Sequence, residues 1–180
     1  MIQRGIKDRI ILFADEAGFC LHPKLGRVWF KKGKEQPVVY TRSQHQKRIN
    51  VTGWVDPVNG NHGIIKHEKG NTDSFIKFLS HIAGRFKDKM VDLWVDGPRW
   101  HKGEKVRDFC REHKQIKIHY LPPYHPELNR QEILWKIMRY EETTNVYFET
   151  IEDLEKAIFK RSQRWKPTKI LSLCQFNYCV

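Results

Sequence analysis

The chain has 180 residues, 39% of them hydrophobic, and a formal net charge of +12. This size is most simply one domain with one sizeable core, and it excludes a second full domain. The charge favours a polyanionic partner, nucleic acid above all, although a membrane surface would also attract it. No run approaches the ~20 apolar residues that cross a bilayer, and the start of the chain lacks the apolar stretch of a signal peptide. We therefore expect a cytoplasmic protein without a membrane partner.

The four cysteines, Cys20, Cys110, Cys174 and Cys179, show neither a CxxC pair nor zinc-finger spacing. A structural metal cluster is therefore not expected, and the cysteines are interpreted as reduced thiols. Cys174 and Cys179 could bridge only in an oxidising compartment.

The first third of the chain predicts antiparallel strands. A continuous apolar run at 9–14 is typical of a strand buried on both faces and predicts the central strand. Further strands are predicted near 27–31 and at 49–55, with a short candidate at 38–40. The turn sequence "DPVNGN" then predicts a hairpin into a strand at 63–66.

Helices and strands alternate in the remaining two thirds. An amphipathic helix is predicted after a cap at Asn71 or Thr72, because Phe75, Leu79 and Ile82 recur at helical spacing. The later predicted elements are a strand at 91–95, a helix at 104–113, a strand at 116–120, a helix around Glu132 and a final helix at 151–165. A strand that follows a crossover helix pairs in parallel, so we expect 91–95 to lie beside 9–14.

Three acidic residues stand where predicted elements begin or end. Asp15 follows the run at 9–14, Asp96 follows the strand at 91–95, and Glu132 comes after the loop "LPPYHPELNRQ". The three prolines of that loop fix φ and remove amide donors, so the loop has few alternative conformations and positions a carboxylate. Three acids at element ends predict a metal site.

The motifs around these acids resemble the catalytic domain of DDE transposases. They are "FADEAGF" around Asp15, "LWVDGPRWHKG" around Asp96, and the proline loop that leads to Glu132. Residues 97–131, 35 in number, separate the second acid from the third, close to the spacing of the family. The resemblance is to the bacterial insertion-sequence branch of the mariner-like superfamily, and includes "GRVWFKKG" and "QHQKRINVTGWVDP". Each motif alone is weak, and their order and spacing make the resemblance specific.

The resemblance implies a fold and an activity. The fold is an α/β, RNase H-like domain over residues 1–180, with a mixed five-stranded sheet of three antiparallel and then two parallel strands flanked by helices. The activity is DNA strand cleavage and strand transfer of an insertion sequence. The expected partners are double-stranded DNA, as transposon ends and target, and a second copy in a homodimer assembled on DNA. Longer relatives carry an upstream helix-turn-helix region, which we expect to be absent from this chain.

The resemblance also implies two Mg²⁺ or Mn²⁺ ions. Carboxylates suit such hard cations, and two ions roughly 3.5–4 Å apart can serve both the attacking and the departing oxygen. By resemblance, Asp15 bridges both ions, Asp96 holds one and Glu132 completes the other. The nucleophile is first water and then the freed 3′-hydroxyl of the transposon end.

The sequence is also compatible with other roles for these acids. A lone Asp at a strand end is more often a turn former or a helix cap. Neighbouring acids are the rivals: Glu16, Asp92 and Glu127. Side-chain alternation puts Glu16 on the face opposite Asp15 if the strand continues, whereas Glu127 is the hardest to exclude.

Supporting and DNA-binding residues are predicted beside the motifs. His101 and His125 are candidates to assist at the scissile phosphate, although both could be ordinary loop histidines. Trp100 is a candidate base-stacking residue, although tryptophans more often belong to the core. The candidate phosphate contacts are Arg42, Lys47, Arg48, Arg99 and Lys102, which would position DNA without reading its sequence.

The chain departs from the family pattern at three positions. Gly97 stands where many relatives have Asn, His125 where many have Ser, and Arg130 where Pro is usual. The alternatives to a transposase are therefore a catalytically silent DNA-binding relic or partner subunit, and an RNase H-type nuclease that acts on RNA–DNA hybrids. Cleavage supported by Mg²⁺ or Mn²⁺, and the preferred duplex, distinguish them.

Overall fold

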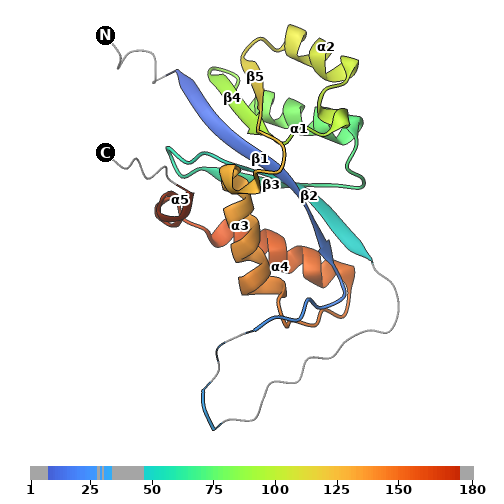
Figure 1. Ribbon diagram of the computed structural model, residues 1–180, viewed down its shortest axis with the longest axis vertical. Helices are drawn as coiled ribbons and strands as arrows, with labels where there is room; N and C mark the ends of the chain where they lie inside the picture. The colour runs from blue at the N-terminus through green and yellow to red at the C-terminus, as the bar shows by residue number, and fades with distance from the viewer. Residues whose placement is uncertain (1–7, 28, 30, 34–46, 175–180) are drawn as a thin grey trace.

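The computed structural model describes residues 8–27, 29, 31–33 and 47–174 (Figure 1). The strands are β1 (Arg9–Cys20), β2 (Arg48–Val55), β3 (His62–His67), β4 (Met90–Val95) and β5 (Ile116–Tyr120). The helices are α1 (Thr72–Arg85), α2 (Glu104–Glu112), α3 (Arg130–Met138), α4 (Ile151–Arg164) and α5 (Pro167–Cys174). None of the helices in the described part of the chain is long and apolar enough to cross a membrane.

The strands form one mixed sheet in the order β3-β2-β1-β4-β5. β1 runs antiparallel to β2, and β2 runs antiparallel to β3. β4 and β5 extend the other side in parallel, with β4 beside β1. The predicted five-stranded sheet, with its central first strand, is therefore confirmed.

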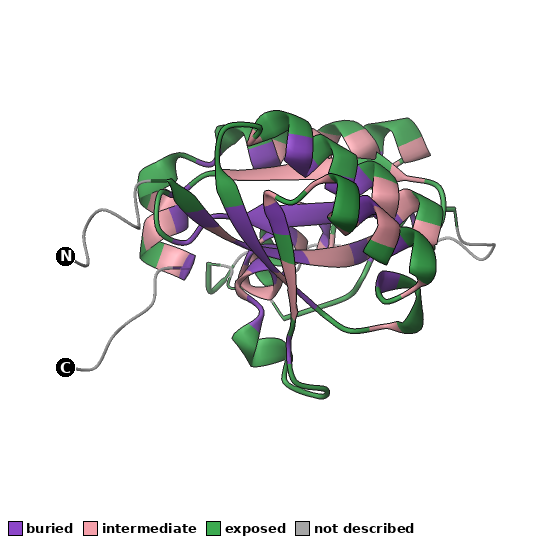
Figure 2. Ribbon diagram, turned by 90° about the horizontal axis from the view of Figure 1, so that it is seen from above, coloured by how far each residue is buried: buried purple, intermediate pink, exposed green. Residues whose placement is uncertain are grey.

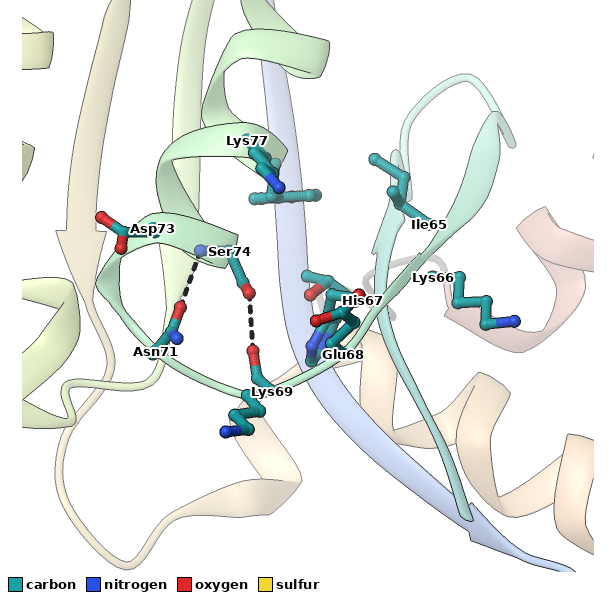
Figure 3. A pocket seen from close by; sticks show the side chains of 11 residues that line it. Ile65, Lys66, His67, Glu68, Lys69, Asn71, Asp73, Ser74 and Lys77 are labelled. Atoms are coloured by element: carbon teal, nitrogen blue, oxygen red, sulfur yellow. Dashed lines mark hydrogen bonds between the residues drawn. The ribbon is translucent and has the colours of Figure 1, made fainter. Parts of the chain in front are cut away.

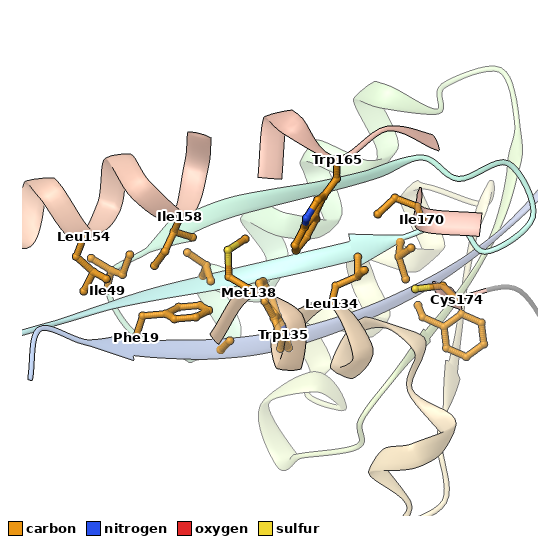
Figure 4. Packing of buried hydrophobic residues seen from close by; sticks show 14 of the residues in the cluster. Phe19, Ile49, Leu134, Trp135, Met138, Leu154, Ile158, Trp165, Ile170 and Cys174 are labelled. Carbon is orange, nitrogen blue, oxygen red and sulfur yellow. The ribbon is translucent and has the colours of Figure 1, made fainter. Parts of the chain in front are cut away.

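Helices cover both faces of the sheet (Figure 1). α1 and α2 pack on one face, where Leu12 and Leu93 lie among Phe75, Phe78 and Ile82. α3, α4 and α5 pack on the other face, and Figure 4 shows residues from all three helices meeting those of β1 and β2 there. Figure 2 shows that the buried residues follow the strands, as expected for a sheet covered on both sides.

Side-chain alternation along β1 decides which residues face which layer. Leu12 and Ala14 belong to the core under α1, whereas Phe13 and Ala17 belong to the core under α3. Asp15 therefore faces α3, and Glu16 faces the α1 side.

The prediction that the first strand ends before Asp15 is wrong. β1 continues to Cys20 because residues 15–20 pair in antiparallel register with β2. Polar Asp15 interrupts the apolar run without ending the strand, because its backbone stays paired with Gly53 of β2.

The predicted strand at 27–31 is absent from the described residues of that range. The segment before this range pairs with residues outside the sheet. Lys24 forms an isolated parallel β-bridge with Thr144, and the Gly26 N–H donates to Asn145 Oδ1 at 2.9 Å. The candidate at 38–40 lies outside the described residues.

The C-terminal part holds an element that the sequence did not predict. After α4, Pro167 opens the short helix α5, whose Ile170 and Cys174 are fully buried. Cys20, Cys110 and Cys174 are free thiols, and Cys179 lies outside the described residues. Burial raises the pKa of the Cys174 thiol to about 11, so it stays protonated.

Candidate active site

The parallel pairing of β1 with β4 brings Asp15 and Asp96 together. Phe13 pairs with Trp94 in this ladder, and the two aspartates stand two residues further along each strand. Asp96 is the first residue after β4, whereas Asp15 lies in the middle of β1, opposite Gly53 of β2. Both acids therefore lie where β4 ends against the continuing central strand.

Glu132 joins them because the start of α3 is tied to β1. Asn129 caps the helix, and its buried side chain accepts a hydrogen bond from the Gln131 amide at 3.1 Å. Its Nδ2 also donates to the carbonyl of Ala14 at 3.0 Å. One side chain thus holds the first turn of the helix, which carries Glu132, to the residue next to Asp15.

A glycine lets α3 approach this closely. A Cβ built on Gly53 would lie 2.4 Å from Gln131 Nε2 and 2.6 Å from the ring of Trp135. These distances are shorter than van der Waals contact, so any larger residue would push α3 away from β2. Gly53 pairs directly with Asp15, and its missing side chain therefore helps to set the position of Glu132.

The three carboxylates interact strongly. Burial raises the pKa of Asp15 to about 8, together with the negative charges of Glu132 and Asp96 and a hydrogen bond with the Glu132 carboxyl. Like charges held close in a half-buried site cannot all ionise easily. The Asp15 carboxyl therefore holds a proton near neutral pH, unless a cation replaces it.

This donor set suits a hard divalent cation. Three carboxylates from β1, the end of β4 and α3 supply the oxygen ligands that Mg²⁺ and Mn²⁺ prefer. Within the described residues, however, no group of three or more His, Cys, Asp and Glu side chains is arranged to hold a metal ion as it stands.

His101 is buried and holds the loop after Asp96. Its Nδ1 donates to the Asp96 carbonyl at 2.8 Å, and its ring stacks on Phe75 with centroids 3.8 Å apart. Its Nε2 lies 3.4 Å from Glu16 Oε1, and Tyr120 Oη donates to its carbonyl at 2.7 Å. The structure therefore places His101 beneath the site as a support, on the α1 side of the sheet.

Three of the predicted DNA contacts lie on that same loop. Arg99 and Lys102 are exposed, and Trp100 is 40% exposed. The Lys102 ammonium lies 4.8 Å above the ring of Tyr120. Lys102 and Tyr120 line a cavity of about 520 Å³ together with Asp96 and the proline loop.

The other predicted DNA contacts lie elsewhere. Lys47 and Arg48 are exposed at the start of β2, where Arg48 pairs with Cys20 and donates to Asn50 at 2.7 Å. Cys20 lies five positions along β1 from Asp15, which corresponds to roughly 17 Å. Arg42 lies outside the described residues.

The rival acids have other partners. Burial alone would raise the pKa of Asp92, but hydrogen bonds from His119 and Arg9, at 2.7 and 2.9 Å, hold it below its usual range. Glu127 is exposed and bonds His125 at 2.8 Å, which lowers the pKa of Glu127. His125 is exposed as well, so the structure brings neither residue of this pair into the acid cluster.

A second cavity, of about 560 Å³, lies between β3 and the start of α1 (Figure 3). Asn71 caps α1 there by accepting from the Ser74 amide at 2.9 Å. Lys66, Lys69 and Lys77 line it, but none of the three acids does. It is separate from the candidate active site.

Sequence reasoning missed Asn129 and Gly53. Asn129 had a usable signal, because an N-cap residue three positions before a Glu is the pattern of a capping box. No sequence signal marked Gly53, because its role depends on the contact between β2 and α3, two elements that are far apart in the sequence.

Comparison with known proteins agrees with this geometry. A family described as the DDE superfamily of endonucleases matches residues 10–155. The chain belongs to this family. The three motifs that resemble DDE transposase catalytic domains lie within that match, and the resemblance is confirmed.

Curated and solved relatives are longer than this chain. The chain is 28% identical over 142 residues to the "Insertion element IS630 uncharacterized 39 kDa protein" of Shigella sonnei, covering 75% of the chain and 39% of that protein. It shares the fold of the Mos1 transposase paired-end complex with the left transposon end, at a TM-score of 0.70 and 16% identity, over 96% of this chain and 53% of that one. It also shares the fold of the Mos1 mariner paired-end complex with Mn, at a TM-score of 0.68 and 16% identity, over 90% of this chain and 50% of that one. This DDE-family chain thus spans about half the length of the relatives it matches.

Proposed function

We propose that this chain is the catalytic domain of an insertion-sequence transposase, which cleaves DNA strands and transfers the freed end to a new site. The observation that carries the proposal is the convergence of three carboxylates, from β1, the end of β4 and α3, where burial and the charges of Glu132 and Asp96 raise the pKa of Asp15 to about 8. Strongly perturbed acids that cluster in one place are typical of functional sites. Membership in the DDE family of endonucleases supports the nuclease step.

Asp15, Asp96 and Glu132 are the proposed metal ligands and catalytic residues. Two divalent ions, Mg²⁺ or Mn²⁺, supply the charge that activates an attacking oxygen and stabilises a departing one. The chain contributes the ligands and their positions: Asn129 and Gly53 hold Glu132 near Asp15, and His101 holds the backbone of Asp96. The Mos1 complexes with Mn and with Mg support the use of these metals.

The proposed substrate is double-stranded DNA, at transposon ends and at the target. The similar Mos1 structures are a paired-end complex with the left transposon end and a strand transfer complex. We further propose that the chain acts as a homodimer assembled on two DNA ends, in the cytoplasm. Arg99, Trp100 and Lys102 are the proposed contacts closest to the acids.

A nicking assay on supercoiled plasmid and on short duplexes, with Mg²⁺ or Mn²⁺, tests the proposal. Asp15→Asn, Asp96→Asn and Glu132→Gln should each abolish metal-dependent cleavage. Glu127→Gln is the matched control, since Glu127 is an exposed carboxylate of the same proline loop that bonds to exposed His125. It should cleave like the wild type.

Full cleavage by any of the three acid variants, purified and folded, would contradict the assignment. Wild-type protein that binds DNA but never cuts it in either metal would favour a silent DNA-binding relic. A strong preference for RNA–DNA hybrids would favour an RNase H-type nuclease instead.

A further inference from the structure

Tyr124 is the most exposed of the large hydrophobic side chains in the described residues, at 99%. Its backbone has φ of 64°, in the left-handed region that aromatic residues rarely adopt. A bulky residue at such an angle is strained, and here its own ring packs on nothing that offsets the strain. Strain that persists without a packing benefit points to a role outside the isolated chain.

The loop around Tyr124 is stiff. Pro122 and Pro123 precede it and Pro126 follows it, and each fixes its own φ. Beyond it, the Leu128 amide donates to the His125 carbonyl at 3.1 Å. The ring is therefore presented to solvent by a backbone with little freedom, and binding through it loses little conformational entropy.

The ring stands at the mouth of the candidate active site. Tyr124 and Asp96 line the same cavity of about 520 Å³, and Lys102 and Tyr120 line it as well. The cavity thus combines a carboxylate of the acid cluster, an ammonium group suited to a phosphate, and an aromatic face that nothing covers. These are the groups that one nucleotide would contact through its scissile phosphate, a neighbouring phosphate and its base.

We propose that Tyr124 is a positioning residue that stacks on an unpaired base of the DNA substrate, next to the phosphodiester to be cut near Asp96. This inference rests on the proposed function, because it takes the strand to be cut as the ligand. Every base has a π-face, so the contact would hold the strand in place without reading its sequence. The left-handed backbone sets the ring outward, where a base can reach it.

Two substitutions separate the ring from the backbone. Tyr124→Phe keeps the aromatic face, whereas Tyr124→Asn removes it and leaves a residue that tolerates the left-handed conformation. Tyr140→Asn is the matched control, because Tyr140 is 56% exposed and follows the far end of α3 from Glu132.

The experiment measures the affinity for a fluorescein-labelled duplex with a single-stranded 3′ overhang, by anisotropy in EDTA. A second set of duplexes replaces each overhang nucleotide in turn by an abasic one. We expect Tyr124→Asn to weaken binding about 5- to 150-fold, as loss of one base stack does, and Tyr124→Phe and Tyr140→Asn to bind like the wild type. At one overhang position the abasic substitution should weaken binding to the wild type by the same factor. The same substitution should not weaken binding to Tyr124→Asn any further, because the stacking contact is already lost.

Wild-type affinity in Tyr124→Asn, or losses that multiply at every position of the overhang, would overturn the proposal. So would a wild-type protein that does not bind the duplex at all. Thermal unfolding of Tyr124→Asn should match or exceed that of the wild type, which rules out misfolding as the cause of weak binding. Cleavage in Mg²⁺, measured separately, tests the proposed function. If the protein cuts DNA but the affinity losses from Tyr124→Asn and from the abasic nucleotide are independent at every position, only the stacking proposal is refuted. If the two changes share one affinity loss but the protein never cuts DNA, only the proposed nuclease activity is refuted.

Discussion

Asp15 gives the metal-free protein a characteristic pH dependence. Its pKa in the folded state is about 8, against an ordinary value of 3.8, chiefly because of burial and then because of Glu132 and Asp96. An acid whose pKa rises on folding binds a proton that the unfolded chain has already released. Its contribution to stability therefore becomes steadily less favourable as the pH rises from about 4 to about 8.

Asp15→Asn removes this titration and should flatten the dependence. In EDTA the melting temperature of the variant should exceed that of the wild type at pH 8, and the difference should shrink as the pH falls to about 4 and below, where the carboxyl becomes protonated in the unfolded state as well. Saturating Mg²⁺ should stabilise the wild type far more than the variant. Binding of Mg²⁺ to the wild type near pH 7 should also release a proton, because metal ligands must be deprotonated. Parallel melting curves across this pH range would show that the three carboxylates do not interact as described.

At the scale of elements, the placement of α3 on the sheet depends on a single missing side chain. Gly53→Ala puts a methyl group within 2.6 Å of the Trp135 ring. We expect a loss of about 1–3 kcal/mol in unfolding free energy, as for other overpacked contacts, and a drop in metal-dependent cleavage because Glu132 moves with its helix.

Gly84→Ala is the control for that substitution. Gly84 lies in α1, and a Cβ there would meet nothing within 4 Å. Replacing a helical Gly by Ala should stabilise the protein by roughly 0.5–1 kcal/mol and leave cleavage unchanged. Differential scanning fluorimetry and the nicking assay, run on both variants, measure the contrast. Normal cleavage by a destabilised Gly53→Ala would show that Glu132 does not depend on this contact.

Local patterns were enough to predict most elements and the three candidate acids. The strand at 116–120 has the predicted bounds, and Asn71 caps α1 as expected. The errors have a common physical origin. β1 was predicted too short because its second half is held by antiparallel pairing with β2. The strand near 27–31 was predicted because the sequence does not show that the preceding residues, Lys24 and Gly26, pair with Thr144 and Asn145 instead of with the sheet.

The site was predictable only where it follows from order along the chain. Asp15 and Asp96 end up together because two parallel strands share a register, which the crossover helix already implied. His101 was expected at the phosphate, yet stacking on Phe75 buries it beneath the loop. Such a contact depends on the packing of α1 against the sheet, and no local pattern reports it.

At the scale of the whole molecule, the net charge of +12 does not say where DNA binds. Basic side chains occur at both ends of the sheet. Lys102 lines the cavity that holds Asp96, whereas exposed Lys114 lies just before β5 begins, at the opposite end of that strand from Tyr120. Removing either one changes the total charge equally, so a comparison of the two separates a general attraction from a local contact.

We expect Lys102→Ala to weaken DNA binding and Lys114→Ala to leave it nearly unchanged. A lysine that touches a phosphate releases a counterion on binding, so its loss should reduce the slope of log affinity against log salt by about 0.9, while a distant lysine should not alter the slope. Anisotropy titrations of one duplex at several salt concentrations measure both slopes. Equal slopes and equal losses in the two variants would mean that DNA responds to the summed charge of the molecule, and that the acid-bearing end of the sheet is not where its backbone lies.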